Sequence, residues 1–332
     1  ETFSSRGLGD VYKRQIHDIK YPDIINNISN IGDFMDYHIE KVASANAEVG
    51  EGPVWNPDEK KVYWTDIAGG RLFKYDPESG SNETIHNGVS VGGYRFNEGG
   101  GLVLGTWEGV WLWNSDEDYK VLKEGIIDGT DVPVRINDAT SGPDGSFYGG
   151  TDRVGWKDDA VFRLNTDGSV DVIDEGVELC NGMGFSPDLL EFYSTDTIKK
   201  TIYKWDYNAT SKAITNKRVL VKYEGDGITD GMTVDSEGFI WSAIWWGSKV
   251  IRFDPEGKVE REVHFPATQT SCPMFGGENL NELYVTTASA DFGGEPTGIE
   301  PPGYDFSAYR GGDLFKATLD IQGKPEYKTK FS

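Results

Sequence analysis

The feature that most constrains this chain is a six-fold internal repeat, which begins near residue 50. Each copy has a turn such as NPDEK or GPDGS, then an aromatic-rich strand pattern, then a further strand that often ends in a DP turn. Apolar residues recur at the short spacing of strands and not at the 3.6-residue spacing of a helix. The copies lie about 38 to 50 residues apart, a period typical of β-propeller blades. The sequence therefore predicts an all-β fold, a six-bladed β-propeller.

The repeat also places individual strands. The second strand of each blade is predicted at 61–67, 101–107, 145–151, 191–197, 239–245 and 282–288. The third strand of each blade is predicted at 71–77, 109–115, 160–166, 201–207, 249–255 and 313–319. The sixth copy ends one strand short, and residues 37–44 have a strand pattern before the first copy. We expect 37–44 to pair as the outermost strand of the sixth blade, because that pairing removes the free edges of an open ring.

These boundaries predict one propeller domain over residues 37–330. Residues 1–36 are expected to be a non-native or loosely ordered segment. The first fifteen, ETFSSRGLGDVYKRQ, lack the apolar core of a signal peptide and resemble a translated sequencing-adapter junction. We therefore exclude them from the fold and expect a cytoplasmic protein. Cys180 and Cys272 are too few for a disulfide framework, which agrees with buried thiols in a reducing compartment.

Charge narrows the class of partner. The chain has 32 Lys and Arg residues against 55 Asp and Glu residues, a formal net charge of −23. Such a surface repels phosphate backbones and anionic lipid, so we expect no nucleic-acid partner and no membrane surface. No apolar stretch approaches the ~18 residues of a membrane span. A small-molecule partner is left as the expectation, with the protein a monomer or small homo-oligomer.

One register of the repeat carries polar residues. Glu51, Asn137, Asn181 and Asp230 each lie six residues before the turn of their copy, and the other two copies have Gly92 and Ser271 there. Equivalent positions on the innermost strands of a propeller form a ring about its axis. Two carboxylates facing each other repel, and a divalent cation between them removes that cost. Turn-type polar residues at strand entrances are the alternative for each position singly.

Other residue types restrict the site further. Arg135 lies two residues before Asn137, hence on the same face of a strand, where its guanidinium is suited to binding substrate oxygens or to an ion pair at the rim. The four histidines, at 17, 38, 86 and 264, are scattered singly, which argues against an aryl-esterase propeller with a histidine dyad. A metal here would be held by oxygen, as calcium, magnesium, manganese and less typically zinc are.

These motifs resemble the regucalcin/gluconolactonase family of sugar-lactone hydrolases, also called the senescence marker protein family. The resemblance covers about residues 39–330. It rests on AEVGEGPVW (47–55), RINDA (135–139), CNGMGFSPD (180–188), TDGMTVDSEGFIW (229–241), RFDPEG (252–257), CPMFGGENLNELYVTTA (272–288) and GGDLFKATL (311–319), taken together and in order.

The resemblance implies one divalent cation in the channel, held by Glu51, Asn181 and Asp230, with Asp230 also the catalytic acid and base. It implies that Arg135 and Asn137 contact substrate. The chain departs from regucalcin in one loop, where the position of a further acidic substrate contact falls near Gly155. Asp152, Arg153 and Trp156 are candidates to replace it.

Two functions of different classes follow. The first is metal-dependent hydrolysis of a sugar lactone, such as glucono- or arabinonolactone, by metal-activated water. No serine or cysteine nucleophile is needed for it. The alternative is a non-catalytic propeller that binds metal or a partner, because propellers support many functions.

Overall fold

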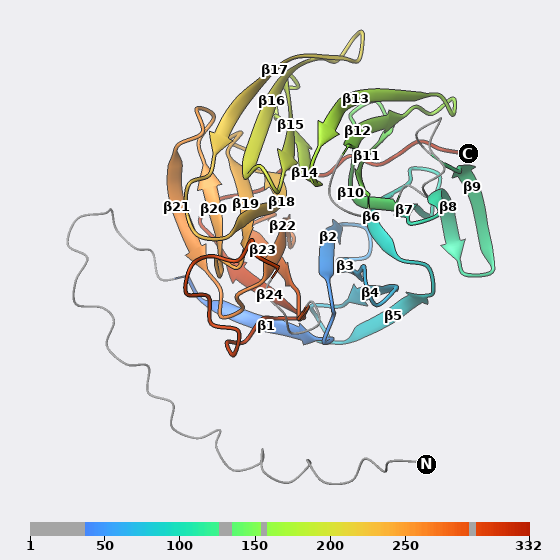
Figure 1. Ribbon diagram of the computed structural model, residues 1–332. Coiled ribbons are helices and arrows are strands. Elements are labelled where there is room, and N and C mark those ends of the chain that lie inside the picture. Colours follow the sequence, from blue (N-terminus) through green and yellow to red (C-terminus); the bar gives the residue numbers. More distant parts are fainter. Residues whose placement is uncertain (1–36, 126–134, 154–157, 292–296) are drawn as a thin grey trace, which may run out of the picture. The chain divides into compact units, whose positions relative to one another are not determined.

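Six four-stranded antiparallel sheets lie around a central axis in the computed structural model, which describes residues 37–125, 135–153, 158–291 and 297–332 (Figure 1). This arrangement confirms the six-bladed β-propeller. Blades one to three contain β2 (Gly50–Asn56), β3 (Lys61–Asp66), β4 (Arg71–Tyr75) and β5 (Asn82–Asn87); β6 (Val91–Phe96), β7 (Leu102–Thr106), β8 (Gly109–Ser115) and β9 (Asp118–Lys123); and β10 (Arg135–Ser141), β11 (Phe147–Asp152), β12 (Asp159–Leu164) and β13 (Val170–Val177).

Blades four to six complete the ring. They contain β14 (Cys180–Phe185), β15 (Glu191–Asp196), β16 (Thr201–Asn208) and β17 (Ala213–Lys222); β18 (Ile228–Val234), β19 (Ile240–Trp245), β20 (Lys249–Phe253) and β21 (Val259–His264); and β22 (Thr270–Gly276), β23 (Glu282–Thr287), β24 (Asp313–Thr318) and β1 (Ile39–Ser44). The predicted second and third strands agree with these bounds within a few residues. In Figure 1 the chain colour advances once around the ring.

The hydrophobic core lies between neighbouring blades. Val103 and Val110 of blade two, for example, pack with Ile136 and Phe147 of blade three, and all four are buried. The two innermost strands of each blade are almost entirely buried, as in β14 and β18, where every residue is buried. Burial between blades therefore holds the six sheets in a ring and fixes where the inner strands meet.

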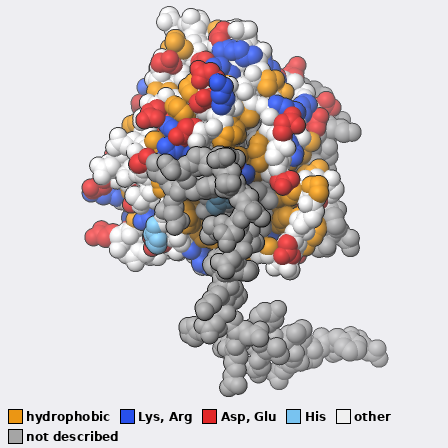
Figure 2. All heavy atoms as spheres, turned by 90° about the vertical axis from the view of Figure 1, so that its left-hand side faces the viewer, with side chains coloured by type: hydrophobic (Ala, Val, Ile, Leu, Met, Phe, Trp, Pro, Cys, Tyr) orange, Lys and Arg blue, Asp and Glu red, His pale blue; other side chains and the backbone are white. Residues whose placement is uncertain are grey.

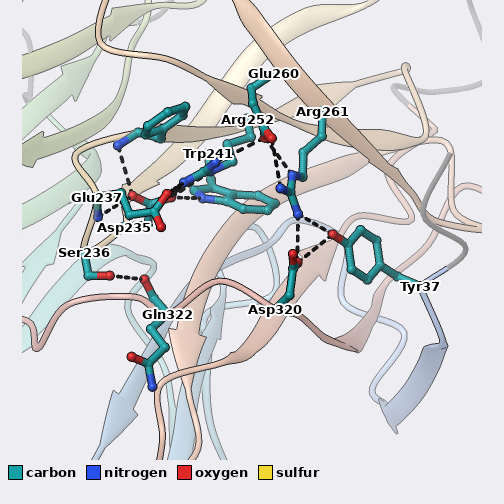
Figure 3. Close-up of polar contacts among 11 residues, drawn as sticks. Tyr37, Asp235, Ser236, Glu237, Trp241, Arg252, Glu260, Arg261, Asp320 and Gln322 are labelled. Atoms are coloured by element: carbon teal, nitrogen blue, oxygen red, sulfur yellow. Dashed lines mark hydrogen bonds and ion pairs between the residues drawn. The ribbon is translucent and has the colours of Figure 1, made fainter. Parts of the chain in front are cut away.

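Blade six combines the first described strand with the last three strands of the chain. β1 pairs antiparallel with β24, with Ser44 opposite Asp313, which confirms the predicted closure. Figure 3 shows a polar cluster beside this seam, in which Tyr37 Oη donates a hydrogen bond of 2.9 Å to Asp320. Arg261 of β21 also pairs with Asp320, at 2.8 Å. Residues from both ends of the fold are thereby attached to blade five.

A second part of the cluster in Figure 3 is buried. Arg252 is 2% exposed and donates to Asp235, which is fully buried, at 2.8 Å. Trp241 Nε1 donates to the same carboxylate at 2.9 Å. A buried ion pair is tolerated when its remaining hydrogen-bonding atoms are satisfied, and here the tryptophan and Glu237 supply those partners.

The expected N-terminal segment, 1–36, lies outside the described residues, so its separateness stays a prediction. Within the described part of the chain, no helix has the length and apolar character needed to cross a bilayer.

Candidate functional site at the propeller axis

All six innermost strands carry a β-bulge at the same height. The pairing register shifts between Glu51 and Val54, between Asn181 and Met183, and between Thr229 and Met232. The other three inner strands shift between residues 91 and 93, 136 and 138, and 270 and 272. We call the predicted set the ring residues: Glu51, Gly92, Asn137, Asn181, Asp230 and Ser271. Each lies at a bulge, a feature that redirects side chains away from the regular alternation of a strand.

The structure brings the three predicted metal ligands together. Glu51, Asn181 and Asp230 are each about 5% exposed or less, and all three line one pocket of about 320 Å³ at the axis. The amide nitrogen of Asn181 donates a hydrogen bond to Asp230 Oδ1. We call this cavity the axial pocket. Asn137 and Arg135 line it as well, so every predicted site residue lies in one place.

The two carboxylates are costly in this position. Burial raises the pKa of Glu51 well above its ordinary range, and the nearby charges of Asp230 and Asp138 raise it further. Burial also raises the pKa of Asp230, again with a contribution from Asp138. Within the described part of the chain, neither Glu51 nor Asp230 forms an ion pair with a lysine, arginine or histidine. A positive charge placed between the two carboxylates would lower this cost.

The residue after each predicted ligand is a glycine. Gly52 N donates to Glu51 Oε2 at 2.9 Å. Glycine is required after Asn181 and Asp230 because the inner strands approach closely there. A Cβ on Gly182 would lie 2.3 Å from the Met232 side chain, and one on Gly231 would lie 2.5 Å from Cys272 Sγ. The N-G and D-G pairs of the sequence therefore reflect the crowding of strands at the axis, whereas Gly52 of the E-G pair has a positive φ of 49°, which favours glycine.

Sequence reasoning missed a third carboxylate and its counter-charge. Asp138 is 6% exposed, and burial raises its pKa to about 6, while the charge of Arg95 opposes that rise. Arg95 is itself 5% exposed, and Asp138 is the carboxylate on which its charge acts. Strict alternation along β10 directs Asp138 away from the side that Asn137 faces, and the bulge between Ile136 and Asp138 changes this. A bulge leaves no clear mark in the sequence, although the RINDA motif contains Asp138.

The predicted substrate residues have defined partners. Asn137 Nδ2 donates to the Cys180 carbonyl at 2.9 Å, so the atom left for a ligand is the amide oxygen. Arg135 Nη2 pairs with the Asp152 carboxylate, and its Nε donates to the Asp152 carbonyl at 3.0 Å. The guanidinium also stacks over Trp107, 4.5 Å from the ring centroid. Asp152 and Trp107 therefore orient Arg135, and some of the N–H donors of its planar guanidinium do not point at these two neighbours.

The residues proposed to replace the acidic substrate contact of regucalcin lie in different places. Asp152 lines the axial pocket beside Arg135. Arg153 is not among its lining residues, and its backbone nitrogen donates to Asp159 at 2.7 Å. Gly155 and Trp156 lie outside the described residues. The neighbouring pair Trp245 and Trp246, at 7% and 6% exposed, both line the pocket and pack into an apolar cluster with Ile228.

The donor set fits a hard divalent cation. Two carboxylates and an amide side chain converge, and all of them offer oxygen. Within the described residues no three His, Cys, Asp or Glu side chains form a group that could hold a metal ion, so an ion bound here would also require the Asn181 oxygen. The described histidines His38, His86 and His264 do not line the pocket, which removes the histidine-dyad alternative from this site.

The fold and site together define a six-bladed propeller with an acidic, oxygen-lined pocket at its axis. A family of this architecture matches by sequence, since the family model described as "SMP-30/Gluconolactonase/LRE-like region" covers residues 49–289. The chain belongs to this family, as the motifs predicted.

Individual relatives agree. The chain is 35% identical over 292 residues to the pentonolactonase XacC of Haloferax volcanii, covering 88% of this chain and 98% of that protein. It is 30% identical over 262 residues to the 6-deoxy-6-sulfogluconolactonase of Pseudomonas putida, covering 76% and 88% respectively. Among solved structures, the calcium-binding protein regucalcin of Agrobacterium tumefaciens superposes with a TM-score of 0.78 at 22% identity, covering 88% of this chain and 97% of that one.

Proposed function

We propose that this protein hydrolyses a sugar lactone at the axial pocket, with Asp230 as the catalytic residue. The observation that carries the proposal is the convergence of Glu51, Asn181 and Asp230, buried and without a paired cation, in a chain whose relatives are named lactonases. The substrate is an aldonolactone of the glucono- or pentono- type. We expect it to act on this small molecule as a monomer or small homo-oligomer.

One divalent cation, calcium, magnesium, manganese or zinc, is the proposed cofactor. Glu51, Asn181 and Asp230 would hold it, and the description of the solved regucalcin as calcium-binding supports an ion of this kind. When bound, it supplies Lewis-acid polarisation of the lactone carbonyl and lowers the pKa of water. Its positive charge also removes the repulsion that the buried carboxylates otherwise suffer.

The protein side chains supply the proton transfers and the orientation. Asp230 accepts a proton from the attacking water and returns it to the ring oxygen as the acyl–oxygen bond breaks. Asn181, which donates to Asp230 Oδ1, orients that carboxylate. Arg135 and Asn137 bind the lactone, Asn137 through the amide oxygen left free by its bond to Cys180. Positioning of this kind contributes to catalysis because it prepays the entropy of bringing the reactants together.

The state of the two cysteines is relevant to the cellular compartment. Cys180 and Cys272 are both free and buried, which agrees with the expected cytoplasmic protein, where thiols stay reduced.

The decisive experiment is a screen of aldonolactones by product formation, in EDTA and with each of the four cations. We expect hydrolysis that requires the added cation and that falls sharply in Asp230→Asn. Hydrolysis that is equal in EDTA and with metal, in a protein shown by elemental analysis to be metal-free, would contradict the metal-dependent mechanism. Metal binding with no hydrolysis of any lactone would favour a non-catalytic binding propeller instead.

A further inference from the structure

The segment that follows β24 crosses the face of the propeller opposite the axial pocket. We call residues 319–332 the strap. The six inner strands run in the same direction and carry their ring residues near the start, so their ends and the turns after them lie on the opposite face. The strap contacts these ends and turns. Figure 1 shows the end of the chain, marked C, beside β9 of blade two.

The first part of the strap is attached to blades five and six. Gly323 N donates to the Leu280 carbonyl at 2.7 Å, in the turn between β22 and β23. Ser236 N, in the turn after β18, donates to the Gln322 carbonyl at 3.0 Å. Ile321 is 8% exposed and packs into the hydrophobic core between these two blades. The strap therefore has both backbone and apolar anchors on this side of the ring.

The last part of the strap is attached to blades two and three. Thr329 N donates to the Phe96 carbonyl at the end of β6, at 2.8 Å. Lys330 N donates to the Gly145 carbonyl in the turn after β10, at 2.9 Å. Phe331 is 7% exposed and packs into the core between these blades. In a ring of six, blades two and three face blades five and six across the axis.

The middle of the strap contacts the two remaining blades. The ring of Tyr327 packs edge-to-face on Phe185 at the end of β14 in blade four, with 6.4 Å between centroids. Lys328 pairs with Asp58 in the turn after β2 in blade one, at 2.7 Å. The strap thus contacts every blade, whereas the pairing of β1 with β24 lies within a single blade.

A link across the axis has a mechanical consequence. Blades that pack only on their neighbours can still shift relative to the blades on the far side of the ring. The outer side of the ring seen in Figure 2 has charged and hydrophobic side chains interspersed, as on a surface that faces solvent. The axial pocket depends on distances across the ring, because Glu51, Asn181 and Asp230 come from blades one, four and five.

We propose that the strap is a cross-brace, which couples opposite blades and thereby holds the inner strands of the axial pocket in position from the far face. This inference goes beyond the proposed function and does not depend on it. Ile321 and Phe331 are the two apolar anchors, and they pack in separate clusters on opposite sides of the ring. When one anchor is lost the strap docks less firmly, so the other anchor has less left to contribute.

A double-mutant cycle on Tm, with the full chain in EDTA, tests the coupling. Ile321→Ala and Phe331→Ala should each lower Tm by several degrees, because each removes a buried side chain. The double variant should lose less than the sum of these losses, by about 2 °C or more. Additive losses, the behaviour of distant independent sites, would overturn the brace. Phe331→Leu takes the place of Phe331→Ala if that variant does not fold.

A matched control uses the same substitution elsewhere. Phe73 of β4 is 2% exposed and packs in a cluster of blades one and six that contains none of the strap residues. Phe73→Ala should lower Tm as Phe331→Ala does, but its loss should add to that of Ile321→Ala. A deficit of the same size in both pairs would show that the coupling is a general property of the fold, and would refute a specific role of the strap.

Hydrogen exchange shows whether the brace reaches the axial pocket. Phe331 lies in the core between blades two and three, and it does not line the pocket. Phe331→Ala should nevertheless speed amide exchange in β18 of blade five, across the axis, by about two- to thirtyfold, the range for residues that couple distant sites. Phe73→Ala should change this exchange much less. Equal exchange of β18 in the two variants would refute the positioning role, whether or not the protein binds metal or hydrolyses a lactone.

Discussion

Glu51→Gln should stabilise the metal-free protein and lower its affinity for a divalent cation. In the wild type, Glu51 and Asp230 are buried carboxylates that repel each other when both are ionised. A glutamine keeps the shape and can still accept the 2.9 Å hydrogen bond from Gly52. Its NH₂ group can then face Asp230 as a donor. The substitution thus replaces a repulsion with an attraction, at the cost of one metal ligand.

The size of the effect follows from Coulomb's law. Like charges roughly 4 to 8 Å apart repel by roughly 2 to 4 kcal/mol at an effective dielectric constant of about 20. Proton uptake relieves part of this, so we expect a gain of about 1–3 kcal/mol. In a domain of this length that corresponds to a rise in Tm of about 2–5 °C.

The pH dependence has a definite sign. A carboxylate with a raised pKa binds more protons in the folded state than in the unfolded state, so metal-free wild-type protein loses stability as pH rises above the unfolded pKa of about 4.3. Glu51→Gln removes this contribution. The stabilisation by the variant should therefore be larger at pH 8 than at pH 5.

The assay is calorimetric unfolding in EDTA and in excess metal. A ligand at 100 times its Kd adds about 2.7 kcal/mol to the stability of the protein that binds it. Wild type should therefore gain Tm on adding metal, and Glu51→Gln should gain much less, so that the order of the two proteins reverses. Glu224→Gln, an exposed carboxylate, controls for net charge. If Glu51→Gln in EDTA melts at or below wild type and gains as much from metal, the reasoning is wrong.

Four further outcomes are expected. Asp230→Asn should lower kcat by about 10²–10⁴-fold at saturating metal, the range for a lost general acid and base, and near-normal kcat on an aldonolactone would remove that role. Arg135→Lys should chiefly raise KM because it loses the planar fork of donors, and an unchanged KM would argue against substrate contact. Burial raises the pKa of Asp159 to about 7, so the free energy of unfolding of the wild type should fall as the pH rises from about 4 to 7. Urea unfolding of Asp159→Asn should show a weaker dependence of this free energy on pH. Identical pH profiles for the two proteins would exclude a contribution from Asp159. We propose that residues 1–15 lie outside the fold, so their deletion should leave Tm and activity unchanged, whereas a loss of several degrees would show that they belong to it.

The architecture and the composition of the ring could be predicted because both depend on repetition. Six copies of one strand pattern indicate blade number, and a shared register places Glu51, Asn137, Asn181 and Asp230 around one axis. The pairing of 37–44 with the last strand followed from counting strands against the need to cover edges. Each of these inferences compares one copy with another, so a local irregularity does not disturb it.

What escaped prediction depends on local backbone irregularity and on contacts between blades. Asp138 joins the buried carboxylates because β10 bulges beside it. Arg95 influences that carboxylate from β6, in a different blade and 43 positions earlier in the sequence. The engagement of Arg135 by Asp152 depends on the pairing of β10 with β11. Periodicity within one strand contains none of this information, because it assumes regular alternation.

The seam in blade six determines when this protein can finish folding. β1 is among the first strands to leave the ribosome, yet its partner β24 follows much later, since Asp313 lies 269 residues after its pairing partner Ser44. At about 5–20 residues per second, synthesis of that interval takes roughly 13–54 s. During this time β1 has exposed edges and no native partner, while blades one to five can already pack in order. The ring therefore closes only after β24 is made, and the interval before closure is when a nascent chain of this kind is most exposed to wrong strand pairing and to chaperones.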